Sequence, residues 1–211
     1  MTSRVNVLIL VIAISVALMG CATPISSQIR LLETKKSCCS SMSDMVPSAV
    51  LVGELEFSFT DATPVFPFTS GLSPFVAITL PSTSEGKNVE IRATPEMMAV
   101  TEANSLIFSP IAAVFLDATG RPVVANEDSG IVAVNGGALY MFIIARKVKV
   151  PIGARRLIVY SDSKLHGTSQ TFNYKTVSYL LPVGNVFIPA GGASRVTALY
   201  GVDGKFSVRM E

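Results

Sequence analysis

The chain has 211 residues, of which 49% are hydrophobic and 15% are charged, and its formal net charge is +2. A charge this small, with no long basic or acidic run, argues against a nucleic-acid partner and against a strongly charged substrate. Once the N-terminal signal described next is removed, about 190 residues remain, which is enough for one β-rich domain with a sizeable core.

The N-terminus has the pattern of a lipoprotein signal. Arg4 is its lone basic residue, the stretch from Val7 to Leu18 is mostly aliphatic, and Cys21 follows Leu18-Met19-Gly20. A basic, an apolar and a small-residue region in this order are typical of a secretory signal, and a cysteine at its end is typical of a lipobox. The apolar stretch is too short for a transmembrane helix, which needs about 20 residues. We therefore predict a signal peptide over 1–20 and lipidation of Cys21, palmitate included.

The residues after Cys21 predict a lipid-anchored tether with a short helix over 21–46. Ala22 stands where lipoproteins of the inner membrane often have Asp, so the periplasmic side of the outer membrane is the expected location. Thr23, Pro24 and the neighbouring serines predict a flexible arm, and apolar residues between 29 and 32 predict the helix within it.

Apart from Cys21, the only cysteines are the adjacent pair Cys38 and Cys39. A disulfide between neighbours brings the two Cα atoms closer than disulfides normally allow. In an oxidising compartment the pair can form such a strained ring, bridge to a partner, or remain as buried thiols that pack like small hydrophobic residues. Buried thiols are the default expectation, and the missing C-x-x-C spacing argues against a thioredoxin-like redox site.

The first half of the domain predicts three strands. Residues 51–60 alternate, with Leu55, Phe57 and Phe59 on one side and Glu54 and Glu56 on the other, which predicts a half-buried strand. The continuous apolar run over 75–80 predicts a strand that is buried on both faces. Residues 89–93 alternate again and predict a third strand.

The second half continues in the same way, with strands predicted over 111–116, 139–145 and 157–160. Residues 196–200 and 205–210 flank Gly201-Val202-Asp203-Gly204, and this arrangement predicts a terminal hairpin. Short strands with Gly/Pro turns and no long amphipathic helix predict an all-β fold. We expect an antiparallel, jelly-roll-like β-sandwich over 47–211.

The sequence has no recognisable catalytic, metal or cofactor motif. His166 is its single histidine, and we expect it in a solvated loop. No Gly-x-Ser-x-Gly motif accompanies it, and Glu54 and Glu56 share one face of one strand, where they form a solvated face in place of a catalytic pair across a cleft. The phenylalanines lie at core spacing, and no tryptophan is present to stack on a sugar. We expect no enzymatic activity, no metal and no cofactor.

Several strings resemble the maltose-operon periplasmic protein family. They are Ile107-Phe108-Ser109-Pro110 with Thr119-Gly120-Arg121-Pro122, then Arg156-Leu157-Ile158-Val159-Tyr160 with Asp162-Ser163-Lys164-Leu165, and Tyr200-Gly201-Val202-Asp203-Gly204-Lys205-Phe206-Ser207-Val208. The string Cys38-Cys39-Ser40-Ser41-Met42 is similar to lipoprotein-type relatives, so the resemblance covers about 37–210 in the same order. Longer family members continue with a Pro/Ala-rich extension and a helical tail, whereas this sequence ends at Glu211.

The resemblance implies a lipid-anchored, non-enzymatic accessory in maltose or maltodextrin uptake. Its expected partners are the membrane, reached through the lipid anchor, and a maltodextrin or a component of a sugar transporter. The alternative is a structural or protein-interaction lipoprotein of the envelope that holds no small ligand. A cleft lined with Tyr and Asn or Asp would favour the first function, and a flat surface with an exposed apolar patch the second.

Overall fold

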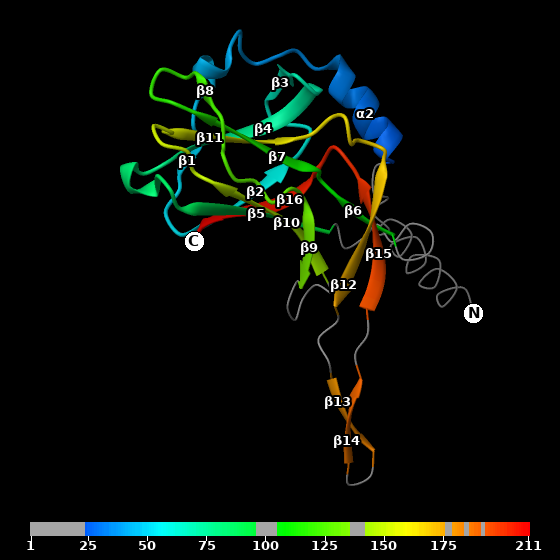
Figure 1. Cartoon of the computed structure of the whole chain (residues 1–211). Coiled ribbons are helices and arrows are strands. Elements are labelled where there is room, and N and C mark those ends of the chain that lie inside the picture. The colour runs from blue at the N-terminus through cyan, green and yellow to red at the C-terminus, as the bar shows by residue number, and fades with distance from the viewer. Residues whose placement is uncertain (1–23, 96–104, 136–141, 176–178, 184–185, 191–192) are drawn as a thin grey trace, which may run out of the picture.

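The structure is a computed structural model that describes residues 24–95, 105–135, 142–175, 179–183, 186–190 and 193–211. In these residues two β-sheets pack around a common core, and an arm of paired strands projects from them (Figure 1). The prediction of an all-β, sandwich-like fold is therefore confirmed. Cys21 lies outside the described residues.

The first sheet has the strand order β1-β4-β11-β7-β8. Its strands are β1 (Ala49–Val50), β4 (Gly71–Thr79), β11 (Arg156–Ser161), β7 (Ile111–Leu116) and β8 (Pro122–Val123), and β3 (Val65–Phe68) also pairs with β4. Only the pair of β1 and β4 is parallel among these strands. The strands predicted over 75–80, 111–116 and 157–160 are β4, β7 and β11, whose apolar runs suit central positions covered on both faces.

The second sheet is antiparallel throughout, in the order β2-β16-β5-β10-β9. Its strands are β2 (Glu54–Phe59), β16 (Gly204–Met210), β5 (Asn88–Thr94), β10 (Phe142–Lys149) and β9 (Val132–Asn135). β5 confirms the strand predicted over 89–93, and β10 contains the described part of the strand predicted over 139–145. β2 begins at Glu54, later than predicted, because the chain turns at Gly53, whose φ of 72° is left-handed.

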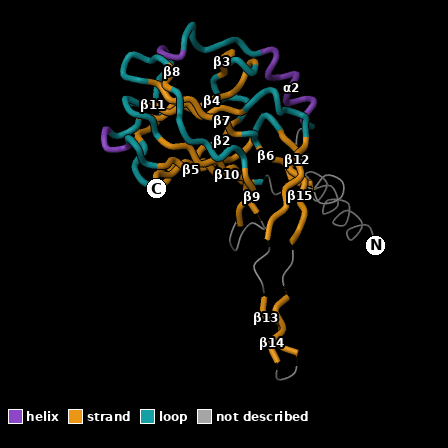
Figure 2. The backbone as a smooth tube through the Cα atoms, viewed as in Figure 1, coloured by secondary structure: helices purple, strands orange, loops and turns teal. Residues whose placement is uncertain are grey.

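The arm is built from the chain between the two last strands of the sandwich. β12 (Ser169–Lys175) pairs with β15 (Ala193–Tyr200), which also pairs in parallel with β6 (Ser105–Phe108). Farther out, β13 (Tyr179–Val183) and β14 (Val186–Ala190) form an antiparallel pair. Figure 2 shows that the described part of this arm is strand and extends well beyond the two packed sheets.

The core lies between the two main sheets, because each presents its apolar alternate residues inward. Phe59 and Phe206 of the second sheet are 1% and 2% exposed, with ring centroids 4.6 Å apart. They belong to the same buried cluster as Phe115 and Leu157 of the first sheet. Burial of each such side chain contributes about 1.5–3 kcal/mol, so this cluster is the main source of stability.

The predicted short helix is α2 (Ile25–Thr34), but it is not part of a free arm. Gln28 and Leu32 are buried, and Leu32 packs with Val65 and Val202. The Gln28 side-chain oxygen accepts a hydrogen bond of 3.0 Å from the backbone N–H of Val202. The prediction of a flexible arm is therefore wrong from residue 25 onward, because the helix has an apolar face that the sandwich covers. Among the described residues, no helix is long and apolar enough to cross a membrane.

The segment after the helix also lies on the sandwich. It contains a 3-10 turn, η1 (Met42–Asp44), and a second such turn, η2 (Ser82–Ser84), precedes β5. Cys38 and Cys39 form a disulfide, with Cys38 exposed and Cys39 packed beside Phe66 and Phe68. The default expectation of two buried free thiols is therefore wrong, because the structure has a disulfide between the adjacent residues Cys38 and Cys39.

The predicted terminal hairpin is wrong as well. β15 and β16 are consecutive in the chain, but β15 pairs with β12 and β6, whereas β16 lies between β2 and β5 in the second sheet. The connection carries the chain from one sheet to another because Val202, at its middle, is buried against α2. Gly201 and Gly204 at the two ends of this connection are typical of a hairpin turn, but packing decides which strands β15 and β16 pair with.

Candidate functional site

The outer face of the second sheet gathers most of the charged side chains that the fold brings together. Strand alternation places polar residues outward because the intervening positions fill the core. On β2, β16 and β5 these are Glu54, Glu56, Ser58, Lys205, Ser207, Arg209, Glu90, Arg92 and Thr94. The strand register aligns Glu54, Arg209, Glu90 and Lys147 in one row across the sheet.

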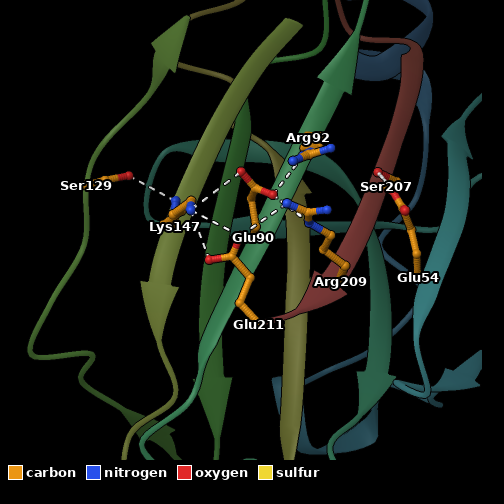
Figure 3. Close-up of polar contacts among 8 residues, drawn as sticks. All are labelled: Glu54, Glu90, Arg92, Ser129, Lys147, Ser207, Arg209 and Glu211. Atoms are coloured by element: carbon orange, nitrogen blue, oxygen red, sulfur yellow. Dashed lines mark hydrogen bonds and ion pairs between the residues drawn. The ribbon is translucent and has the colours of Figure 1, made fainter. Parts of the chain in front are cut away.

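Glu90 is the centre of an ion-pair network on this face (Figure 3). Its side chain is only 3% exposed, and its Oε2 accepts hydrogen bonds from Arg92 Nε and Arg209 Nε, each 2.7 Å long. Lys147 Nζ lies 3.9 Å from the other oxygen. A buried carboxylate is tolerated only when it is paired, and here three cations from two neighbouring strands and its own strand compensate the charge.

Glu211 extends this network at the end of the chain. Its carboxylate is 2.9 Å from Lys147 Nζ and 3.1 Å from Arg209 Nη2. The hydrogen bond from Lys147 is the main reason why the pKa of Glu211 lies below its ordinary value, although partial desolvation opposes the shift. The two carboxylates and three cations therefore hold one another in fixed positions on the sheet.

Beside the network the sheet surface is hollowed, with a volume of about 580 Å³. The polar side chains that line this hollow are Glu54, Glu56, Ser58, Arg92, Thr94, Lys205 and Ser207. Ser207 donates a 2.7 Å hydrogen bond to Glu54. Neither Glu56 nor Lys205 has a side-chain hydrogen bond or ion pair within the part of the chain that the structure describes. We use the name sheet hollow for this depression and for the seven polar residues that line it.

The charges of the sheet hollow balance, since it presents the carboxylates of Glu54 and Glu56 and the cations of Arg92 and Lys205. Such a surface offers hydrogen-bond donors and acceptors side by side and carries no net charge, which suits a neutral polar ligand. Both glutamates are exposed, as predicted, and both lie on β2. A pair on one strand does not flank a scissile bond from two sides, as a glycosidase requires.

His166 lies elsewhere and in an environment that the sequence did not indicate. Its Nε2 is 2.8 Å from Ser161 Oγ, and Ser109 Oγ donates a 3.0 Å hydrogen bond to the same oxygen. Burial lowers the pKa of His166 to about 4, with the charge of Asp162 opposing. The prediction of a solvated loop histidine is wrong, because the loop after β11 folds back over the end of that strand. Ser109 and Ser161 are 0% exposed, so their hydroxyl groups are closed to a substrate, although His166 itself is half-buried.

Neither the cysteine pair nor the two tyrosines Tyr160 and Tyr200 join the sheet hollow. Cys39 packs with Phe66 and Phe68 against the outer side of the first sheet, on the opposite layer. Tyr160 stacks on Phe68 with centroids 4.1 Å apart, and Tyr200 is buried, donating a hydrogen bond to Gln170. Neither ring is therefore a free stacking platform for a sugar.

Sequence reasoning missed Glu90 and its cations. The alternation over 89–93 placed Glu90 on a polar face, but Arg209 lies 119 positions away in the sequence, and no local pattern connects the two. In the described residues no group of three or more His, Cys, Asp or Glu could hold a metal ion.

The chain was compared with protein-family models, with curated proteins and with solved structures, and it matches none of them.

Proposed function

We propose that this protein is a non-enzymatic binding protein of the bacterial cell envelope, anchored through lipid on Cys21, and that it serves as an accessory in maltodextrin uptake. The observation that carries the proposal is the sheet hollow, an open depression of about 580 Å³ whose charges balance. The resemblance of the sequence to the maltose-operon periplasmic proteins supplies the ligand class.

The chemistry of the sheet hollow fits a polyhydroxylated ligand. A sugar presents neighbouring hydroxyl groups that each donate and accept, and Glu56 and Lys205 offer an acceptor and a donor without partners among the described residues. Arg92 and Thr94 line the same depression from the adjacent strand. Because no net charge has to be compensated, a neutral oligosaccharide enters at little electrostatic cost.

The expected affinity is low. A net hydrogen bond contributes about 1 kcal/mol, and four such bonds without aromatic stacking give about −4 kcal/mol, which corresponds to a Kd of about 1 mM. An accessory that raises the local concentration of a sugar near a transporter needs rapid release more than tight binding, and this affinity allows it.

The test is a titration of the mature chain carrying C21S with maltotriose and longer maltodextrins, followed by nuclear magnetic resonance. We expect saturable shifts of backbone signals in β2, β5 and β16 at millimolar sugar. E56A and K205M should each weaken binding about fivefold, the loss of about one hydrogen bond. K164M changes an exposed lysine of the loop after β11 and is the matched control, with unchanged binding expected.

A second candidate function is an interaction lipoprotein without a small ligand. The observation that favours it is the projecting arm, because β13 and β14 pair only with each other among the described strands. A folded protein that shows no shifts with any maltodextrin would rule out the first function and leave this one.

A further inference from the structure

A second hollow lies on the outer face of the second sheet, where β5 begins and β10 ends. It has a volume of about 450 Å³. One of its walls is the pair of Asn88 and Lys149, which the register places opposite each other. The other wall is the segment 126–129, which runs beside β10, with the backbone N–H of Lys149 donating a 3.0 Å hydrogen bond to the carbonyl of Glu127. We use the name end hollow for this depression.

Every charged side chain that lines the end hollow has a counter-charge. The pairs are Lys147 with Glu211, Lys149 with Glu127 and Arg146 with Asp128. The nitrogen of Lys147 lies 2.9 Å from its partner's carboxylate, and that of Lys149 lies 2.7 Å away. A neutral polar ligand therefore fits the end hollow better than an ion, which would have to replace one of these partners.

The polar groups of the end hollow that remain open are amides. Asn88 and Asn126 are exposed, and neither side chain has a hydrogen bond within the part of the chain that the structure describes. An amide has one acceptor oxygen and two N–H donors, and the hydroxyl groups of a sugar match both, because each hydroxyl donates and accepts. The end hollow therefore offers a polyhydroxylated ligand the same chemistry as the sheet hollow.

The Glu90 network is the border between the two hollows. Glu54 and Ser207 line the sheet hollow, and Figure 3 shows them on one side of Glu90. Lys147 and Ser129 line the end hollow and lie on the other side. Glu90 is on the central strand of this sheet and is 3% exposed, so the border is fixed and the two hollows keep their separation.

The separation of the hollows sets the length of a ligand that fills both. Arg92 of the sheet hollow and Asn88 of the end hollow are four positions apart on β5, which is about 14 Å at about 3.4 Å per residue. Both side chains are on the outer face, since alternate residues of a strand share a face. A single sugar ring is too small to contact both, whereas a linear chain of several rings can lie in both hollows and cross the network.

The position of the hollows argues against a peptide as the ligand. A peptide commonly binds by adding a strand to the open edge of a sheet. Both hollows lie on the face of the sheet, and at the end hollow the edge of β10 is occupied, because the backbone N–H of Ser129 donates a 2.9 Å hydrogen bond to the carbonyl of Lys147. A sugar chain needs only side-chain donors and acceptors, which this face supplies.

We propose that the end hollow is a second subsite, and that the two hollows together hold one linear, neutral oligosaccharide that crosses the Glu90 network. This inference rests on the proposed function, which places a sugar in the sheet hollow, and it adds that the ligand is a chain of several sugar units. Each amide of the end hollow adds about one hydrogen bond, which lowers Kd about fivefold. Part of this gain is lost in ordering the longer chain, so we expect a long chain to bind about tenfold more tightly than a disaccharide.

The test compares maltose with maltoheptaose, a longer chain of the same sugar, in nuclear magnetic resonance titrations of the mature chain with C21S. Maltoheptaose should bind about tenfold more tightly than maltose. It should shift the side-chain amide signals of Asn88 and Asn126 together with backbone signals of β2 and β16, with one Kd for both groups. Cellohexaose, whose rings are joined by β-linkages, is titrated in the same way to show which linkage the hollows accept.

Variants of the end hollow test the residues that carry the argument. N88A/N126A removes both amides, and it should raise the Kd of maltoheptaose about tenfold, to that of maltose. Each single variant should raise it about threefold, which keeps the test available if the double variant does not fold. N173A removes an exposed asparagine of β12 that lines neither hollow, and it is the matched control, with unchanged Kd expected.

Equal Kd values for maltose and maltoheptaose, or binding by N88A/N126A like that of the parent, would overturn the second subsite and leave sugar binding in the sheet hollow intact. Binding of cellohexaose across both hollows, without binding of maltoheptaose, would support the second subsite and overturn maltodextrin as the ligand. If none of the three sugars shifts any signal of the folded protein, this inference and the proposed function are both overturned.

Discussion

Replacing Glu90 with glutamine is expected to destabilise the protein although the side chain keeps its size. The carboxylate of Glu90 is 3% exposed and accepts hydrogen bonds from Arg92 and Arg209. An amide removes the charge. Its one oxygen can still accept from both guanidiniums, as Oε2 does, but without charge assistance, and its N–H donors take the place of Oε1 beside Lys147. The three cations around it then face one another without their central anion.

The size of the effect follows from the exposure of the cations. Two charge-assisted hydrogen bonds contribute about 1.5–3 kcal/mol each when fully buried. The side chains of Arg92, Arg209 and Lys147 are 28%, 34% and 47% exposed, so solvent can replace part of the loss. We therefore expect E90Q to lower the free energy of unfolding by about 2 kcal/mol, which in a domain of this size lowers Tm by about 4–8 °C.

Urea and thermal unfolding of the C21S chain, followed by far-ultraviolet circular dichroism, measure this loss. E56Q is the matched control, because Glu56 lies on the same face without a partner among the described residues, and its effect should stay within about 0.5 kcal/mol. Equal stabilities of E90Q and E56Q would refute the reasoning. In a double-mutant cycle, R209M should cost less in E90Q than in the parent if the two residues are coupled.

The remaining predictions concern His166 and Gln28. The pKa of His166 is lowered to about 4, against an ordinary value of about 6.5, so between these pH values the unfolded chain binds a proton that the folded chain does not. Stability should therefore fall as pH drops from about 6.5 to about 4, by about 2–3 kcal/mol. H166Q should flatten this part of a plot of Tm against pH, and an unchanged slope would contradict the assignment. Q28A removes the side-chain oxygen of Gln28, and it should lower the free energy of unfolding by about 1–2 kcal/mol and expose α2 to limited proteolysis. R30A, on the exposed side of the helix, should do neither. Equal protease resistance of the two variants would show that Gln28 does not hold the helix.

Local patterns predicted the strands well. Glu54 to Phe59 alternates between polar and apolar residues, and the structure has a strand there with Phe59 in the core and both glutamates outside. Phe75 and its apolar successors predicted a strand buried on both faces, which β4 is. Such predictions succeed because alternation and continuous apolar runs depend on residues that are neighbours in the chain.

Predictions that depended on partners failed more often. The glycines around Val202 are compatible with a hairpin, but the strands on either side enter different sheets because α2 covers the connection. His166 belongs to a polar loop in the sequence, and it is half-buried because its ring contacts Ser161, which lies at the end of a core strand. In both cases the deciding contact comes from a distant segment.

The sequence by itself determined the class of fold and which face of each strand is polar, since these follow from residue type and spacing. Only the tertiary structure decided that Glu90, Lys147, Arg209 and Glu211 form one network beside the sheet hollow, and that an arm of paired strands projects from the sandwich. The reason is physical: pairing between strands aligns residues that are far apart in the chain, and the register of that pairing is set by packing of the whole core.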